Sequence, residues 1–154
     1  MPKISAGILL FRRRPEGLQV LLVHPGGPFW KNRDKGTWSI PKGEAHPGED
    51  LFECAKRECE EEIGFRRPGP FIPLTPVKLR SGKLVHAWAC EADFDPAMLK
   101  SNTFTAEWPP HSGKIGTYIE VDRAEWFTVA EARIKMSLAQ MGMVEELEKK
   151  LAAR

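Results

Sequence analysis

One acidic segment restricts the fold of this chain more than any other stretch: residues 43–65, GEAHPGEDLFECAKRECEEEIGF. A Pro-Gly pair interrupts regular structure shortly before Asp50, and Gly64 is a natural stop for a helix. Asp50 with Glu53 three residues later matches a capping box in which aspartate replaces the usual serine or threonine. The segment therefore predicts one helix that begins after Asp50 and ends at Gly64.

Side chains of this helix project at about 100° per residue, so the sequence also predicts which face each one occupies. The apolar side chains share one arc about 120° wide, the expected core face: Leu51, Phe52, Ala55, Cys59 and Ile63. Glu53 and Glu60 point away from that arc, into solvent. Glu58, Glu61 and Glu62 lie on an arc that overlaps and flanks the apolar one. Three carboxylates are therefore expected at the buried edge of the helix.

Carboxylates at a partly buried edge need a compensating charge. Like charges three and four positions apart on a helix repel by roughly 0.2–0.5 kcal/mol per pair. A buried carboxylate must also be paired, protonated or bound to a metal. A solvated acidic face is the ordinary interpretation of a Glu-rich helix, but Glu53 and Glu60 already occupy the solvent side. Oxygen ligands of this kind suit Mg²⁺, with Mn²⁺ as the alternative.

The segment resembles the Nudix box, whose pattern is G-x5-E-x7-R-E-U-x-E-E-x-G-U with U an aliphatic residue. All seven fixed positions of the pattern are filled: Gly43, Glu49, Arg57, Glu58, Glu61, Glu62 and Gly64. Cys59 and Phe65 stand at the two U positions, and both are apolar. The resemblance implies an α/β fold, the Nudix α/β/α sandwich with a central mixed β-sheet and the catalytic strand–loop–helix at residues 37–64.

The resemblance also implies roles for the residues of the box. Glu61 and Glu62 would be direct metal ligands, and Glu58 would be a ligand or the general base. The backbone carbonyl of Lys42, just before the box, would be a further metal ligand. The ammonium group of the same lysine would reach a phosphate of the substrate.

Other charged residues would support this centre. Arg57 would orient Glu61, four residues further on, and Glu49 would pair with Arg57 and fix its fork geometry. The family often takes a further ligand or general base from outside the box. Glu120 is the expected residue because of its spacing from a later tryptophan, with Glu107 as the alternative. For either residue, an ordinary surface carboxylate is the competing interpretation.

A Gly- and Pro-rich loop at residues 24–35 combines aromatic and cationic side chains, which suits a nucleotide base and its phosphates. A loop anchored by its own aromatic residues is the competing interpretation. The string WSIPKGE, followed by PGED, resembles the diadenosine tetraphosphate and diphosphoinositol hydrolase branch of the Nudix family. The predicted substrate-binding residues are Phe29, Trp30, Lys31, Arg33, Trp38 and Lys42.

Hydrophobic patterning predicts the remaining elements. Strands are expected at residues 4–11 (central in its sheet), 18–23, 36–42, 71–79, 83–91 and 114–121. Residues 92–113 are expected to form a long irregular loop at the rim of the pocket. Thr128 with Glu131 and Ser137 with Gln140 match further capping boxes. Leu138 begins an apolar stripe at helical spacing that continues to Leu151 and indicates a core or dimer face.

Length and composition favour one domain over residues 1–154, long enough for a sizeable core, and the resemblance implies that it is a Nudix domain. A net charge of +2 argues against nucleic-acid or membrane-surface binding. Cys54, Cys59 and Cys90 lack metal-ligand spacing and suggest reduced thiols. The chain shows neither a signal peptide nor an apolar run of about 18 residues, so a cytoplasmic location is expected.

These observations predict a Mg²⁺-dependent pyrophosphohydrolase that cleaves a nucleoside diphosphate linked to another moiety, such as a dinucleoside polyphosphate or a nucleoside triphosphate. The alternative is a nucleotide-binding sensor module that does not cleave its ligand. A damaged box is typical of such modules, and this box is intact. The partner would be a small nucleotide or other diphosphate, and the chain would be a monomer or a homodimer.

Overall fold

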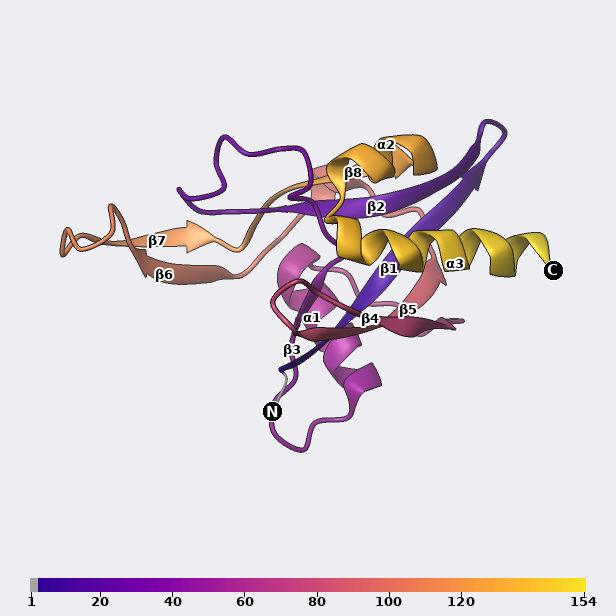
Figure 1. Cartoon of the computed structure of the whole chain (residues 1–154), viewed down its shortest axis with the longest axis horizontal. Helices are drawn as coiled ribbons and strands as arrows, with labels where there is room; N and C mark the ends of the chain where they lie inside the picture. Colours follow the sequence, from indigo (N-terminus) through magenta and orange to yellow (C-terminus); the bar gives the residue numbers. More distant parts are fainter. Residues whose placement is uncertain (1–2) are drawn as a thin grey trace.

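A six-stranded mixed sheet forms the centre of the protein in the computed structural model, which describes residues 3–154 (Figure 1). Five strands follow the order β4-β5-β1-β2-β8, and β3 pairs with β1 off this path. Their bounds are β1 Ile4–Arg14, β2 Gly17–Pro25, β3 Lys42–Glu44, β4 Ile72–Lys78, β5 Leu84–Glu91 and β8 Val121–Thr128. The β1–β5 pair is parallel and the other pairs are antiparallel.

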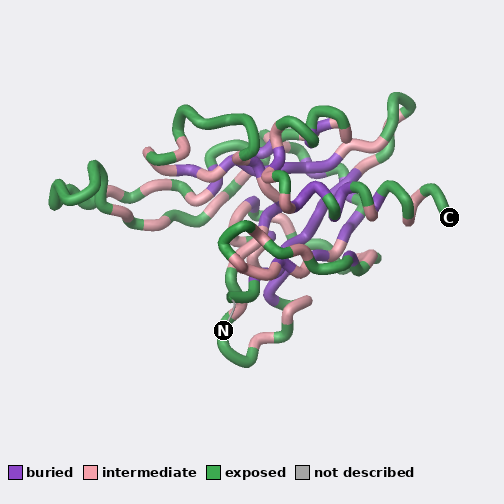
Figure 2. Tube along the Cα trace, viewed as in Figure 1, coloured by how far each residue is buried: buried purple, intermediate pink, exposed green. Residues whose placement is uncertain are grey.

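The strand β1 occupies the middle of this sheet, as its apolar sequence predicts. Residues 5–11 are all buried, and the buried part of the trace in Figure 2 runs along β1 and β2. A strand covered on both faces has no need of alternating polar residues, which explains the continuous run ISAGILLF. The first two strands pair as an antiparallel hairpin, with Phe11 opposite Val20.

Helices cover both faces of the sheet, so the predicted α/β/α arrangement is confirmed. The helix α1 (Leu51–Ile63) packs on one face, where Ile8, Leu10 and Leu21 point. The helices α2 (Val129–Lys135) and α3 (Met141–Ala152) belong to the other core, with Leu9 and Leu22. Neighbouring residues of β1 thus enter different cores because successive strand side chains point to opposite faces.

Capping largely follows the sequence. The Asp50 side chain accepts a hydrogen bond from the backbone N–H of Glu53, and Gly64 ends α1 at φ 77°, the left-handed conformation that glycine adopts readily. Thr128 and Glu131 form the predicted capping box. The box predicted at Ser137 and Gln140 is wrong, because Ser137 makes no side-chain cap.

Other element predictions need correction. The strand predicted at residues 36–42 is not continuous: Trp38 and Ser39 form isolated bridges with Met136 and Val23, and only Lys42 belongs to a strand, β3. Pro41 contributes to this break because it has no N–H to donate to a ladder. Leu138 is 82% exposed, since it lies in the 3-10 turn η2 (Leu138–Gln140) that precedes α3.

The segment at residues 92–113 is more regular than expected. It contains the 3-10 turn η1 (Pro96–Met98) and the strand β6 (Thr103–Glu107), which pairs with β7 (Ile115–Ile119). The two strands form an arm that projects away from the central sheet (Figure 1). Across residues 3–154, each helix is too short or too polar to pass through a lipid bilayer.

Truncation of Leu147 tests the importance of the α3 face. Leu147 is fully buried among the core residues of β1, β2 and α3. We expect Leu147→Ala to lower the free energy of unfolding by about 2–5 kcal/mol, because it leaves a cavity that the surrounding residues fill only in part. Urea denaturation measures this change, with the exposed Glu148→Ala as the control. A loss no larger than that of the control would contradict this packing role.

Candidate active site

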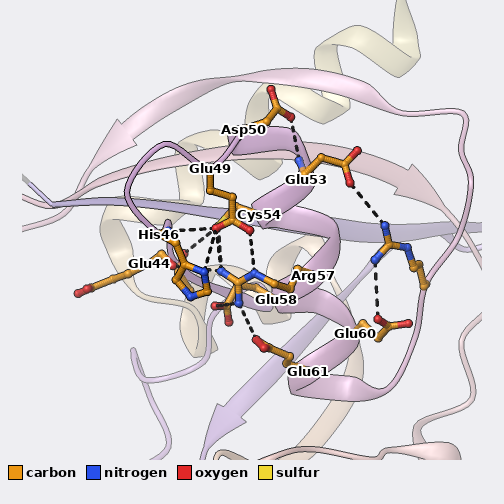
Figure 3. Close-up of polar contacts among 12 residues, drawn as sticks. Glu44, His46, Glu49, Asp50, Glu53, Cys54, Arg57, Glu58, Glu60 and Glu61 are labelled. Atoms are coloured by element: carbon orange, nitrogen blue, oxygen red, sulfur yellow. Dashed lines mark hydrogen bonds and ion pairs between the residues drawn. The ribbon is translucent and has the colours of Figure 1, made fainter.

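The guanidinium group of Arg57 donates hydrogen bonds to three carboxylates of the acidic segment (Figure 3). Its Nε and Nη2 atoms donate to the two carboxylate oxygens of Glu49 at 2.8 and 2.9 Å. Its Nη1 atom donates to Glu58 at 2.9 Å and to Glu61 at 2.8 Å. The pairing of Glu49 with Arg57 and the contact of Arg57 with Glu61 are therefore both present as the sequence predicts. One cation holds three carboxylates in fixed positions.

Glu49 joins the helix to the loop before it. Its carboxylate accepts a hydrogen bond from the backbone N–H of His46 as well as the two from Arg57. The pKa of Glu49 is lowered from 4.5 to about 2. The hydrogen bonds from Arg57 are the largest cause, and the hydrogen bond from the backbone of His46 is the next. Glu49 therefore stays ionised and fixes the orientation of the guanidinium.

Glu62 lies on the other side of the helix edge and is not held by Arg57. Its carboxylate accepts a hydrogen bond from the backbone N–H of Lys42 at 3.2 Å. The pKa of Glu62 is raised to about 8, first by burial and then by the nearby carboxylates of Glu58 and Glu120, although the hydrogen bond from Lys42 lowers it. Burial also lowers the pKa of the Lys42 ammonium group, followed by repulsion from Lys83. A second cation close to Glu62 would therefore be stabilising.

Gly43 allows the helix to approach β3 closely. A Cβ atom placed on Gly43 would lie 2.1 Å from the carboxylate carbon of Glu58. The thiol of Cys54 donates a weak hydrogen bond to the Gly43 carbonyl at 3.7 Å. Cys54 is also buried, although the helical wheel does not include it in the core face. The Glu58 carboxylate can therefore occupy this position because residue 43 is a glycine and has no side chain.

Glu120 enters this region from the far end of the sequence. It follows β7 and lines a cleft of ≈ 550 Å³ together with Lys42 and Glu62. Burial raises the pKa of Glu120, and so does Glu61. Glu107, the alternative, lies at the outer end of β6, where its carboxylate accepts hydrogen bonds from the backbone of His111 and Gly113. The structure thus brings Glu120 to the acidic cluster and holds the Glu107 carboxylate in the turn of the arm.

The donor chemistry of this cluster fits a hard divalent cation. Burial, followed by a neighbouring carboxylate, raises the pKa of Glu58, Glu62 and Glu120, and Glu61 is one of the neighbours that act on Glu58 and Glu120. All offer oxygen ligands, which Mg²⁺ and Mn²⁺ prefer. Across residues 3–154, however, no three acidic, His or Cys side chains already converge on one ion position. Arg57 holds two of the four carboxylates, and its charge compensates theirs.

The residues predicted to bind substrate separate into three groups. Trp30 and Lys42 line the cleft. The Arg33 guanidinium stacks on Phe29, 4.5 Å from the ring centroid, beside the exposed Lys31, and none of these three lines the cleft. The interpretation of this loop as self-anchored is thus also supported, because Phe29 and Trp30 pack edge to face.

Trp38 is the clear correction among these residues. Its side chain is 1% exposed, and its indole N–H donates to Asp34 at 2.7 Å. The ring packs edge to face on Phe127 and His24, inside the core. Trp38 is therefore a core residue, and its side chain is too deeply buried to contact a substrate.

Sequence reasoning missed Ser39 and Gln140, which both line the cleft. The buried Gln140 side chain accepts from the backbone N–H of Ile40 and donates to the Ser39 hydroxyl, each at 3.2 Å. Gln140 thereby provides a hydrogen-bond partner for the backbone N–H of Ile40, in the irregular segment before β3. One hundred residues separate Gln140 from Ile40, so local spacing carries no sign of this pairing.

Comparison with known proteins gives a family match. The model of the NUDIX domain matches residues 1–147. An octanoyltransferase of Myxococcus xanthus is 30% identical over 129 residues, which cover 83% of this chain and 28% of that protein. Nudix hydrolase 7 of Arabidopsis thaliana is 36% identical over 62 residues, 40% of this chain and 21% of that protein. The chain thus spans less than a third of the length of either relative.

Solved structures show the same fold. A C. elegans Ap4A hydrolase in a binary complex superposes with a TM-score of 0.68 at 19% identity, over 97% of this chain and 99% of that one. The NUDIX domain of Shewanella oneidensis NrtR, complexed with ADP ribose, superposes with a TM-score of 0.65 at 16% identity, over 98% and 89%. These identities are low, so the likeness establishes the fold alone.

The contact of Glu49 with Arg57 predicts an acid-dependent stability. Because the pKa of Glu49 is lower in the folded chain, near 2, than its ordinary value of 4.5, its contribution is present above about pH 4.5 and is lost as the pH falls toward 2. We expect Glu49→Gln to lower the thermal midpoint at neutral pH. The difference from the unaltered protein should shrink below about pH 4.5.

The matched control places Glu49→Gln in an Arg57→Gln background. With the guanidinium removed, the effect of Glu49→Gln should lose most of its pH dependence, because Arg57 is the largest cause of the lowered pKa. Thermal unfolding followed by circular dichroism between about pH 7 and pH 3 measures both differences. An effect of Glu49→Gln that stayed constant over this range would contradict the assigned pairing.

Proposed function

The chain belongs to the Nudix family, and from this premise we propose that it is a divalent-metal-dependent diphosphatase. Its substrate would be a nucleoside diphosphate linked to another moiety, such as a dinucleoside polyphosphate or a nucleoside triphosphate. The observation that carries the proposal is the carboxylate cluster of Glu58, Glu61, Glu62 and Glu120, of which Glu62 and Glu120 line the cleft. Partly buried carboxylates that repel one another favour a bound cation.

Mg²⁺, or Mn²⁺ in its place, would be held by Glu58, Glu61 and Glu62, together with the backbone carbonyl of Lys42. When bound, such an ion supplies charge neutralisation of the diphosphate and a water of lowered pKa. Arg57 would keep Glu58 and Glu61 in the orientation that this role requires, and Glu49 would keep Arg57 in place.

The remaining chemistry would fall to residues of the cleft. The Lys42 ammonium group would pair with a phosphate oxygen, and its partial burial strengthens that attraction. Glu120 would accept the proton of the attacking water. It suits this role better than Glu58, because Glu58 is already ion-paired with Arg57 at 2.9 Å. Attack of the water oxygen on phosphorus would expel a phosphate-type leaving group.

The nucleoside would occupy the part of the cleft beside Trp30. This indole lines the same cleft as Glu62 and Glu120, and an aromatic face suits a base. Phe29 and Arg33 would hold the loop that carries Trp30 through their stacking contact. Three free thiols, Cys54, Cys59 and Cys90, fit a reducing compartment, and we propose a cytoplasmic location on that ground.

The alternative is a domain that binds a nucleotide without cleaving it. The NUDIX domain solved with ADP ribose shows that a protein of this fold can be captured with such a ligand. The complete set of seven fixed residues in the box favours the enzyme. Tight nucleotide binding without turnover of dinucleoside polyphosphates, nucleotide sugars, ADP-ribose, oxidised nucleotides or diphosphoinositol phosphates would favour the binding module.

Glu61→Gln tests the proposed centre directly. The substitution removes one carboxylate charge and keeps the shape of the side chain. We expect kcat to fall by at least about 100-fold with Mg²⁺, while the thermal midpoint changes little, because a carboxylate that holds the metal acts mainly on the reaction. Phosphate or nucleotide release from the substrates above measures the rate.

Glu60→Gln is the matched control. Glu60 is the neighbouring residue and is exposed, and within residues 3–154 the one ion pair of its carboxylate is a long one with Arg66 at 3.7 Å. It should keep nearly full activity. Equal activity of Glu61→Gln and Glu60→Gln would overturn the assignment of Glu61 to the metal.

A further inference from the structure

A second groove lies beside the cleft and outside the acidic cluster. Its volume is ≈ 690 Å³, and it is lined by three lysines, Lys3, Lys78 and Lys83, with Glu44 and the turn between β4 and β5. We refer to it as the lysine groove. Ser81 in that turn lines both the lysine groove and the cleft. The two depressions are therefore neighbours that share one rim.

The lysine groove carries an excess of positive charge. Glu44 is the one carboxylate among the residues that line it, and it lies 3.1 Å from the ammonium group of Lys83 and 3.7 Å from that of Lys3. Within the described part of the chain, Lys78 has no carboxylate oxygen within 4 Å. Glu44 thus neutralises one of three ammonium groups. Such exposed ion pairs contribute little to stability, so a multivalent anion could displace them at low cost.

The pairing of β1 explains why these residues come together. Near its start, β1 pairs with β3 on one side, Ser5 opposite Glu44, and with β5 on the other, Ile4 opposite Leu84. Lys3 and Lys83 directly precede the paired residues Ile4 and Leu84. The positive charge of the groove is therefore built onto the frame of the central sheet, and its position is as well defined as that frame.

Lys42 connects the groove with the proposed reaction centre. It lines the cleft, its backbone donates to Glu62, and the ammonium group of Lys83 is close enough to repel its own. Positive charge thus extends from Lys42, which lies beside the acidic cluster, to Lys83 and the other lysines of the groove. A single phosphate would reach only one end of this array, whereas a linear phosphate chain would follow it.

We infer that the lysine groove binds the phosphate groups that extend beyond the diphosphate held in the cleft. The preferred substrate class is then a nucleotide with a linear chain of three or more phosphates, in preference to a diphosphate linked to an uncharged group. This inference rests on the proposed function for the position of the scissile diphosphate. The binding of a phosphate chain to the groove itself does not depend on turnover.

The first test measures binding without metal and without reaction. Inorganic tripolyphosphate is titrated calorimetrically into the full chain in the presence of EDTA. We expect the double variant Lys78→Gln/Lys83→Gln to bind at least about tenfold more weakly than the unaltered chain, because two charge-assisted contacts are lost. The control Lys114→Gln/Lys149→Gln removes the same charge from exposed positions on the arm and on α3. It should bind within about twofold of the unaltered chain.

Binding of tripolyphosphate by Lys78→Gln/Lys83→Gln that equals that of the unaltered chain would overturn the inference. An equal loss in the control would also overturn it, because net charge alone would then account for the effect. Thermal unfolding of each double variant verifies that the fold is retained.

The second test compares two substrates with Mg²⁺. For a dinucleoside tetraphosphate we expect Lys78→Gln/Lys83→Gln to raise KM by about tenfold with little change in kcat, because the lost contacts are remote from the scissile bond. For ADP-ribose, which has two phosphates, KM should stay the same. Equal effects on both substrates would contradict the assignment of the groove to the outer phosphates. If the unaltered chain cleaved neither, the proposed function would fail, and the tripolyphosphate titration would still decide on the groove.

Discussion

The guanidinium group of Arg57 is the interaction on which the acidic helix depends. It makes close ion pairs with Glu49, Glu58 and Glu61, and without it three carboxylates at the edge of one helix would repel one another. Arginine suits this position because its planar fork donates to several carboxylate oxygens at once and stays charged. Glu62, which Arg57 does not reach, has instead a strongly raised pKa of about 8. The chain thus compensates part of its acidic cluster and leaves the remainder able to attract a cation.

The central strand β1 connects this cluster with the rest of the molecule. It pairs with β2 and β5 and also with the short strand β3, which carries Lys42 and Gly43 to the helix. Two cores pack against its opposite faces. The positions of the acidic helix, the cleft and the lysine groove therefore all depend on one buried strand, β1. Rigid support of this kind is what a site requires if its charged groups are to keep their positions.

Most of the fold was accessible from hydrophobic patterning and capping. The apolar run of β1, the strand β5 and the caps at Asp50, Gly64 and Thr128 are local properties, and each is present as expected. The errors have a common physical origin. Trp38 is an aromatic residue next to a predicted site, and only its packing against Phe127 and His24 reveals it as a core residue. The arm of β6 and β7 has the mixed, exposed sequence of a loop, and pairing between its strands makes it regular.

The sequence alone determined the helix and its solvent and site faces, because these depend on spacings within one segment, and the resemblance to the Nudix box implied the pairing of Glu49 with Arg57. The tertiary structure decided which distant groups join them. Glu120 meets the cluster because it lies between β7 and β8, and β8 pairs with β2 in the central sheet. Gln140 reaches Ile40 through the packing of η2. Lys3 and Lys83 converge through the register of β1 with β5. Strand register and helix packing are set by the balance of the whole core, and no local spacing in the chain encodes them.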